Sequence, residues 1–463
     1  MDYRIERDSM GEVRVPADAL YGASTQRAYE NFPISGRRFG RRFIWALGLV
    51  KASAAVVSGQ QGFVDAARAA AIVKAAEEVI DGALDDQFVL DVFQTGSGTS
   101  TNTNANEVIA HRAVALTEGA VAGWIHPNDH VNFGQSSNDV IPTAIYVSAA
   151  AAIHEDLLPA LVALQESFAG KAEEFADVVK SGRTHLMDAT PVTLGQEFSG
   201  YASQVEHGVA RLKHAVHEVE ELALGGTAVG TGLNAPDGFA AATIDEIGRR
   251  TGIAFREASN HFEAQSAKDG AVAVSGVLKT ISVSLFKIAN DLRWLSSGPR
   301  TAISEIRLPS LQPGSSIMPG KVNPVMPEMM MQVAAQIFGN DTAITWAGAN
   351  GNFEVNVMMP VMSSNLDESI AILAAAAKTL RERCVDGIEA NADRARELVE
   401  KNIIVITSLN PHIGYDKGAE IAKEAFLSGR NVRDVALERG VMTADELDAA
   451  LDLKKMTEGG IIG

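Results

Sequence analysis

Long segments of the chain place apolar residues every three to four positions, which is the spacing of one face of an α-helix. Residues 196–224 carry such a face, made of Phe198, Tyr201, Val205, Val209 and Leu212. Residues 264–295 carry another, made of Val272, Val274, Val277, Leu278, Ile281, Leu285, Ile288 and Leu292. Both patterns predict long amphipathic helices.

Three further segments read as helices: residues 142–179, where Pro142 and Thr143 suit a helix start, residues 327–346, and residues 358–388. Apolar faces of this length usually pack on one another as a bundle. Strand signals are few, and the short candidates are residues 13–15 and 303–308. No GxGxxG follows a strand, so a dinucleotide-binding fold is not indicated. The pattern predicts an all-α, mainly helical fold.

The net charge and the lack of targeting signals indicate which partners and which cellular location to expect. Lys and Arg total 40 against 58 Asp and Glu, giving a net charge of -18, so nucleic acid is not expected as a partner. The charged N-terminal residues show no signal-peptide pattern. No uninterrupted run of about 18 uncharged apolar residues is present, so no membrane span is expected. We therefore expect a cytoplasmic protein.

Cysteine usage excludes one kind of chemistry. Cys384 is the only cysteine. A structural disulfide within the chain is impossible, and a cysteine-ligated iron–sulfur cluster needs several thiolates. No cofactor and no metal are expected.

Polar, glycine-rich connections separate the predicted helices, at residues 96–106, 126–139, 182–195, 225–237 and 308–327. Because loops on a rigid scaffold often carry function, we expect the chemistry to lie there. The last of them contains GSSIMPGKVNP, residues 314–324. Its glycine spacing and the Val322 after Lys321 do not fit a phosphate-binding loop. Two interpretations remain: a Gly/Pro-rich surface loop, or a mobile lid that carries a reactive serine beside a lysine.

GSSIMPGKVNP closely resembles the signature loop of the fumarase/aspartase superfamily. Four further motifs are similar to that family and occur in its order: TGSGTSTNTNANEV (95–108), HPNDHVNFGQSSND (126–139), GRTHLMDATPVTLGQEFSGY (182–201) and GGTAVGTGLNAP (225–236). The resemblance covers nearly the whole chain. It implies removal of a proton beside a carboxylate, an aci-carboxylate carbanion, and departure of a group from the neighbouring carbon.

The resemblance also implies the residues that do this work. Ser315 is the expected base, and Lys321 and Asn323 are expected to hold the substrate carboxylate where negative charge develops. His185 matches the second catalytic position, and Glu328 matches the carboxylate that orients it.

Five short polar side chains resemble the family's substrate-binding set: Thr99, Ser136, Ser137, Asn138 and Thr184. Such hydroxyls and amides can surround a small dicarboxylate with neutral donors. The same residue types are also common helix caps, and both interpretations can hold together. For the glycines of Gly96–Ser97–Gly98 we expect a tight turn.

His126 and His130 have the spacing of metal ligands on a helix, but Pro127 fits a helix interior poorly, so zinc is not expected. By resemblance, His126, Asn128 and Asp129 belong to a secondary anion site. The arginine expected three positions before His126 is Gly123, which puts that site in doubt.

Within the superfamily, residues 225–234 and NPHIGYD (410–416) resemble the class II, iron-independent fumarases. That family implies a fumarate hydratase, a hydro-lyase of the tricarboxylic acid cycle that removes water from L-malate. An aspartate ammonia-lyase is the alternative within the superfamily. An inactive structural helical bundle is the alternative of another class, although a scaffold has no need to retain all five catalytic positions.

The resemblance implies three domains, over residues 1–139, 140–390 and 391–463, with the central one a long helical bundle. It also implies a homotetramer whose active sites are each built from three subunits. Long helices with broad apolar faces need partners to cover them, which agrees with assembly.

Overall fold

The computed structural model describes residues 2–117 and 125–462, and these are mainly helical, as predicted. Two compact units divide the chain. The first contains Met1–Pro159, Gly208–Ser282 and Val333–Ala375, and the second contains Ala160–His207, Val283–Gln332 and Ala376–Gly463. The boundaries fall inside long helices, so each unit is described by itself.

The first unit begins with an antiparallel hairpin, β1 (Tyr3–Asp8) and β2 (Gly11–Pro16), in which Tyr3 pairs with Pro16 and Asp8 with Gly11. The predicted strand at residues 13–15 lies in β2. The other elements wholly within this unit are α1 (Ala23–Asn31), α2 (Arg41–Gln60), α3 (Ala66–Ile80), η1 (Asp85–Gln87), α4 (Thr99–Leu116), η2 (Pro127–Val131), α5 (Ser137–Ala152), η3 (Ile153–Leu157), η4 (Val216–Val219), β5 (Glu221–Leu222), α8 (Phe239–Thr251), β6 (Arg256–Glu257), α9 (His261–Ser266), β8 (Gly351–Asn352) and β9 (Val355–Asn356).

Helix α5 begins earlier than the sequence pattern suggests. Ser136 Oγ accepts the Asn138 N–H at 3.2 Å, and Asp139 Oδ1 accepts the Ser136 N–H at 2.9 Å, forming a capping box. The predicted helix start at Pro142 was wrong, because Pro142 lies inside the helix. The predicted segment 142–179 also contains one π-helical turn, η3, and its helix ends at Glu174.

The second unit contains an antiparallel hairpin that the sequence did not predict, β3 (Val179–Thr184) and β4 (Met187–Thr193). The predicted strand at residues 303–308 is shorter, β7 (Ile306–Arg307), and pairs with β10 (Glu389–Ala390). The remaining elements are η5 (Val385–Gly387), α13 (Ala392–Glu400), η6 (Ile403–Leu409), α14 (Asn410–Ile413), α15 (Tyr415–Ser428), α16 (Val432–Glu438), α17 (Ala444–Ala450) and η7 (Lys455–Thr457).

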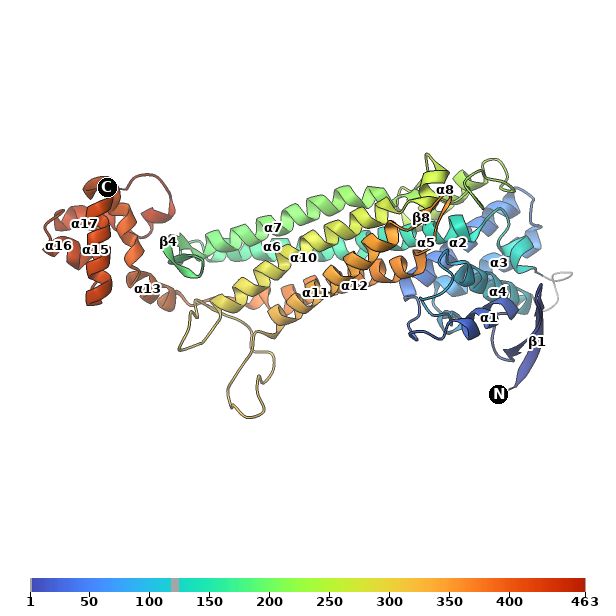
Figure 1. Ribbon diagram of the computed structural model, residues 1–463, viewed down its shortest axis with the longest axis horizontal. Helices are drawn as coiled ribbons and strands as arrows, with labels where there is room; N and C mark the ends of the chain where they lie inside the picture. Colours follow the sequence, from blue (N-terminus) through green and yellow to red (C-terminus); the bar gives the residue numbers. More distant parts are fainter. Residues whose placement is uncertain (1, 118–124, 463) are drawn as a thin grey trace. The chain divides into compact units, whose positions relative to one another are not determined.

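Five long helices have residues in both units: α6 (Leu158–Glu174), α7 (Leu194–Ala215), α10 (Asp269–Leu295), α11 (Val325–Gly348) and α12 (Met359–Arg383) (Figure 1). Buried side chains follow α10 at alternating steps of three and four, at Ala271, Val274, Leu278, Ile281, Leu285, Ile288, Leu292 and Leu295. The predicted face is therefore largely confirmed, but Val272 and Val277 are only partly buried. All five predicted face residues of α7 are buried.

Buried polar pairs fix how the long helices meet within the first unit. Ser275 Oγ of α10 donates to Asp341 Oδ1 of α11 at 2.8 Å, and Asn340 Nδ2 of α11 donates to Ser369 Oγ of α12 at 3.1 Å. A buried polar group without a partner is unfavourable, so each pair favours one register of neighbouring helices over others.

Three helical stretches are long and apolar enough to cross a bilayer by length and composition: Arg41–Gln60, Ser137–Glu174 and Asp269–Leu295, with mean hydropathies of 1.3, 1.5 and 1.6. The sequence criterion was stricter, because it required an uninterrupted uncharged run, and the expectation that the chain has no membrane span stays a prediction. The first two windows are 78% and 56% buried inside the protein, whereas the window in α10 is 44% buried. More than half of the residues in the α10 window are therefore not buried in the single chain.

The C-terminal helices of the second unit have a core of their own. It includes Leu409, Ile421, Val435 and Leu447, with Met442 and Met456 packed against it. The division of the chain into three domains stays a prediction.

Candidate active site

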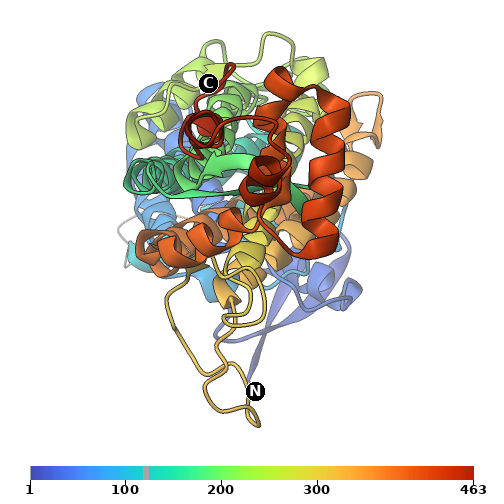
Figure 2. The same cartoon turned by 90° about the vertical axis from the view of Figure 1, so that its left-hand side faces the viewer.

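The segment between β7 and α11 forms an irregular loop that is closed at its neck (Figure 2). The Gly314 N–H donates to the Lys321 carbonyl at 2.7 Å, and Asn323 Nδ2 donates back to the Gly314 carbonyl at 3.0 Å. Gly314, which precedes Ser315, is thus tied to Lys321 through the backbone and to Asn323 through its side chain. Ile317 and Met318 at the tip are 83% and 48% exposed, so the tip is open to solvent.

The hydroxyl oxygen of Ser315 accepts hydrogen bonds from two backbone N–H groups of the same loop. The N–H groups of Ile317 and Met318 donate to Ser315 Oγ at 3.2 and 3.1 Å. Donors aimed at an oxygen stabilise negative charge on it, so they lower the free energy needed to form the alkoxide. The role of Ser315 as a base stays a prediction.

A cavity of about 390 Å³ in the second unit is lined by three of the predicted residues, Lys321, Asn323 and Glu328. Glu328 lies in the first turn of α11. Arg293, near the end of α10, lines the same cavity, and its Nη1 donates to Asn290 Oδ1 at 3.3 Å. The cavity is therefore lined by two cations, two amides, from Asn290 and Asn323, and a carboxylate.

Thr184 and His185 lie at the exposed tip of the β3–β4 hairpin, where Thr184 pairs with Met187. His185 and Leu186 form the two-residue turn, with φ angles of 56° and 61°. A two-residue hairpin turn of this kind requires positive φ at both positions. Residues other than glycine and asparagine rarely adopt positive φ. The two residues are therefore held in a strained conformation by the strands beneath them.

Among the described residues of one chain, no hydrogen bond joins His185 to Glu328. The proposed orientation of the histidine by this carboxylate stays a prediction.

In the first unit, the predicted substrate-binding residues meet at two helix starts. Thr99 opens α4, and its Oγ1 lies 2.7 Å from Ser137 Oγ, in the first turn of α5. Asn138 Nδ2 donates to the Ala228 carbonyl at 2.7 Å, which adds the loop 225–237 to the group. Ser136 caps α5, so the structural interpretation of that serine is confirmed. The fold therefore gathers three of the polar loops in one place.

The two glycines of the Gly96–Ser97–Gly98 turn serve different purposes. Gly98 has φ of 73°, as expected for a tight turn. A Cβ on Gly96 would lie 1.7 Å from the Val357 carbonyl oxygen, so this glycine permits close approach of another backbone segment. The Met359 N–H donates to the Gly96 carbonyl at 3.0 Å across the same contact.

A buried charged network that sequence reasoning missed supports the Ser136–Asn138 segment. The Lys51 side chain is 0% exposed, and its Nζ donates to Asn132 Oδ1 at 2.8 Å and Gln135 Oε1 at 3.0 Å. Asp139 Oδ2 accepts the N–H groups of Gly225 and Thr227 at 3.1 and 2.9 Å. The available signal was a lone lysine within an apolar helix.

Burial affects both ionisable groups of this network. It lowers the pKa of Lys51 to about 7, and the charge of Asp139 opposes this effect. Burial raises the pKa of Asp139 to about 6, although the backbone N–H groups that donate to its carboxylate act to lower this pKa.

Replacing Lys51 by methionine is expected to change how stability depends on pH. Because the pKa of Lys51 is lowered on folding, the unfolded chain binds more protons between about pH 7 and about pH 10, and the free energy of unfolding rises with pH there. Lys51→Met removes this contribution. The melting temperature of the parent minus that of the variant should therefore increase as the pH rises from about 7 to about 10. Differential scanning calorimetry checks this, with the exposed Lys287→Met as control. A constant difference between parent and K51M would contradict it.

His126 acts as the N-cap of η2, which consists of one π-helical turn. Its Nδ1 accepts the N–H groups of Asn128 and Asp129 at 3.2 and 3.1 Å, and His130 Nδ1 accepts the His126 N–H at 2.8 Å. Neither histidine presents Nδ1 as a free ligand, and no cluster of metal-ligating side chains occurs within residues 2–117 and 125–462. Gly123 lies outside the described residues, so the secondary anion site stays a prediction.

The class of protein follows from this fold and from two family models. Residues 11–339 match the family described as "Lyase", and residues 405–458 match the one described as "Fumarase C C-terminus". The protein is therefore a lyase with a helical fold.

Similar proteins narrow the class further. The chain is 53% identical over 462 residues to "Fumarate hydratase class II" of Mycobacterium tuberculosis (strain CDC 1551 / Oshkosh), covering 99% of this chain and 96% of the relative. It is 51% identical to the protein of that name from Ralstonia nicotianae (strain ATCC BAA-1114 / GMI1000), covering 97% of this chain and 98% of the relative.

A class II fumarase from Schistosoma mansoni has the same fold, with a TM-score of 0.96 and 37% identity over 98% of this chain and 99% of that one. A fumarate lyase:delta crystallin from Brucella melitensis, in a crystal structure bound to cobalt, gives a TM-score of 0.92 and 44% identity over 98% of this chain and 100% of that one. The chain belongs to the class II fumarate hydratase family and is a hydro-lyase.

Proposed function

We propose that this protein catalyses the reversible elimination of water from L-malate to give fumarate, with Ser315 as the base. The observation that carries the proposal is the pair of backbone amides, from Ile317 and Met318, that donate to Ser315 Oγ. They lower the energy of a serine alkoxide, which is the form able to remove a proton from carbon. Family membership supports the choice of substrate.

In the proposed mechanism, Ser315 removes a proton from the malate carbon beside a carboxylate, and the electron pair forms an aci-carboxylate. Lys321 and Asn323 hold that carboxylate, because a cation and an amide donor stabilise the charge that develops there. The hydroxyl then leaves from the neighbouring carbon as water, taking a proton that His185 delivers directly or through water. Product release, return of the proton from Ser315 to solvent and reprotonation of His185 from solvent complete the cycle.

Thr99, Ser137 and Asn138 supply neutral donors for the dicarboxylate, together with Thr184. The contact between Thr99 and Ser137 supports this role, since it places two hydroxyls side by side at two helix starts. Helix N-termini favour anions, because their backbone N–H groups lack partners within the helix.

Supplying L-malate and L-aspartate separately tests the function. The conjugated alkene product absorbs in the ultraviolet, and we expect absorbance to rise with L-malate and to stay at the background rate with L-aspartate. Rapid release of ammonia from L-aspartate, with no reaction of L-malate, would assign the chain to the aspartate ammonia-lyases. Failure with both substrates would favour the inactive helical bundle.

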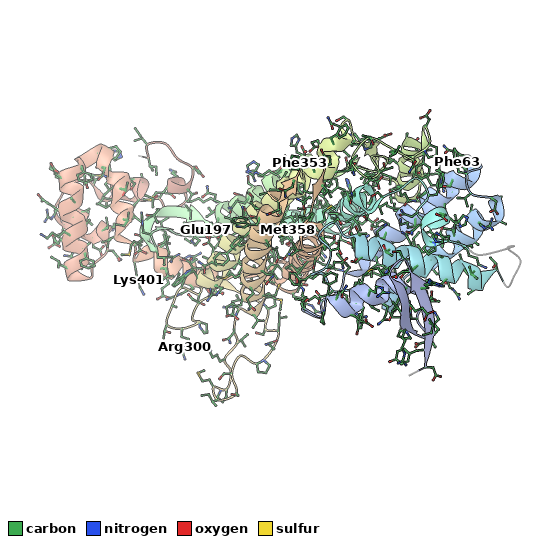
Figure 3. All side chains as sticks on the ribbon, turned by 45° about the vertical axis from the view of Figure 1, so that its right-hand side comes forward. Phe63, Glu197, Arg300, Phe353, Met358 and Lys401 are labelled. Carbon is green, nitrogen blue, oxygen red and sulfur yellow. The ribbon has the colours of Figure 1, made fainter. Side chains whose placement is uncertain are left out.

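We further propose that the protein is a homotetramer, located in the cytoplasm, whose active sites are each completed by three subunits. Apolar side chains remain open to solvent in the single chain, among them Val283 at 54%, Trp346 at 70% and Phe353 at 92%. Phe353 is labelled in Figure 3. Another copy of the chain would cover such surface.

A charge introduced on α10 is expected to disrupt this assembly. Val283→Glu places a carboxylate where an apolar contact between copies is proposed, and desolvating it is unfavourable. Sedimentation velocity should show a tetramer for the parent and smaller species for V283E. Leu427→Glu is the matched control, since Leu427 is 73% exposed on α15, which is not one of the long helices. A parent that sediments as an active monomer would contradict the proposed assembly.

A further inference from the structure

Four charged side chains meet beneath the hairpin that carries His185, and two of them are fully buried. Arg183 Nη1 and Nη2 donate to Glu305 Oε2 and Oε1 at 2.8 and 2.9 Å. Lys180 Nζ donates to Glu197 Oε1 at 2.7 Å and lies 3.3 Å from Glu305 Oε2. The side chains of Lys180 and Glu305 are 1% and 0% exposed, whereas Glu197, labelled in Figure 3, is 27% exposed.

Arg183 and Glu305 are oriented relative to each other more strictly than neutralisation of two charges alone would require. Arg183 binds Glu305 through two parallel hydrogen bonds, an arrangement that fixes the angle as well as the distance between the two groups. Buried ion pairs contribute little net stability, because removing both charges from water is unfavourable, but breaking one leaves an uncompensated charge. Such a pair is better suited to hold a backbone in one position than to stabilise the fold.

On one side, this pair holds the turn that presents His185. Arg183 precedes Thr184 and His185 directly, and the turn has positive φ at two residues that are not glycine. Farther down the hairpin, Asn402 Nδ2 donates to both strands, at Ser181 Oγ and the Ala189 carbonyl, at 3.0 and 2.8 Å. Of these two supports, the Arg183–Glu305 pair is the one next to the strained tip.

On the other side, Glu305 lies at the root of the loop that carries Ser315. Its backbone N–H donates to the Leu295 carbonyl at the end of α10, and its carbonyl accepts the Asn391 N–H, both at 2.8 Å. Strand β7 follows immediately, and the loop begins after it. One residue is therefore fixed to the start of the Ser315 loop through its backbone and to the His185 turn through its side chain.

We infer that Glu305 is a positioning residue that couples the His185 turn to the root of the Ser315 loop, through its paired hydrogen bonds with Arg183. It touches no reacting atom. The inference rests on the proposed function, because it assigns Glu305 an effect on turnover through His185. A displacement of about 1 Å of a catalytic group can lower a rate by about 10²-fold, so loss of this anchor should appear mainly in kcat.

The test compares Glu305→Gln with Glu197→Gln, each of which neutralises one carboxylate of the same network. E305Q keeps the shape of the side chain, but its single amide oxygen cannot replace the two carboxylate oxygens that accept from the two guanidinium nitrogens. We expect E305Q to lower kcat by about 10- to 100-fold with KM changed by less than about threefold. E197Q, which does not contact Arg183, should lower kcat by less than about threefold.

A double-mutant cycle with His185→Asn separates positioning from general damage. If Glu305 acts through His185, E305Q should have little further effect on kcat in the H185N background. An equal loss in both backgrounds, or a normal kcat for E305Q, would overturn the inference. If E305Q does not assemble, Arg183→Lys keeps the charge and loses the paired geometry, and a normal kcat for R183K would overturn it equally.

Hydrogen–deuterium exchange gives a readout that does not depend on activity. In E305Q, but not in E197Q, amides of the 184–187 turn and of the 308–324 loop should exchange faster than in the parent. Unchanged exchange in both segments would overturn the coupling even if the parent converts no L-malate. A parent that is inactive on L-malate while E305Q loosens both segments would overturn the proposed function alone.

Discussion

Replacing Ser315 by alanine should lower kcat for L-malate by at least about 10³-fold, the upper part of the range for loss of a positioned base. The two amides that now donate to Ser315 Oγ would then face no oxygen, and the loop would lose the hydroxyl proposed to take the proton from carbon. Steady-state ultraviolet assays of malate conversion measure this effect. The melting temperature and the oligomeric state should not change, because the loop is exposed.

Ser316→Ala is the matched control, since it removes a hydroxyl from the neighbouring position of the same loop. Its kcat should stay within about threefold of the parent, as expected for a surface substitution without a catalytic role. If S315A retained a near-parent kcat, or if S316A were the slower variant, Ser315 would not be the base.

His185→Asn should lower kcat by about 10²-fold, because the departing hydroxyl would lose its proton donor. Asparagine suits the test, since it tolerates positive φ better than most residues and should preserve the turn. Comparing kcat of parent and variant over a range of pH also shows whether an ionisation of the imidazole has been lost.

Leu186→Asn provides the control for the turn itself, since Leu186 shares the left-handed conformation but bears no ionisable group. L186N should keep kcat within about threefold of the parent. Equal losses in H185N and L186N would assign the effect to the conformation of the hairpin and leave His185 a structural role.

The proposed catalytic residues of the 308–324 loop could be predicted because they lie close together along the chain. GSSIMPGKVNP sets Ser315, Lys321 and Asn323 within ten residues of one another, so any compact loop keeps them close. The structure adds the closed neck between Gly314 and Lys321 and the two amides on Ser315 Oγ. These features depend on backbone dihedral angles, which a motif does not state.

The β3–β4 hairpin could not be predicted from periodicity. Its first strand, Val179–Thr184, follows a helical segment, and the pattern there was read as a helix that continues to residue 179. Pairing with Met187–Thr193, and the anchor from Asn402, decided the outcome. Strand pairing outweighs local propensity where cross-strand and tertiary contacts satisfy the backbone.

The helical class, most of the buried faces of α7 and α10, and the residue types available for chemistry could all be predicted from the amino-acid sequence, because helical periodicity and loop motifs act over short distances along the chain. The distant residues that support these elements could be identified only from the folded chain. Lys51 meets Asn132 and Gln135, and Glu305 meets Arg183, across separations of 81 to 122 residues. Such partners are chosen by burial, since a charge removed from water must find whichever opposite or polar group the folded chain brings to it.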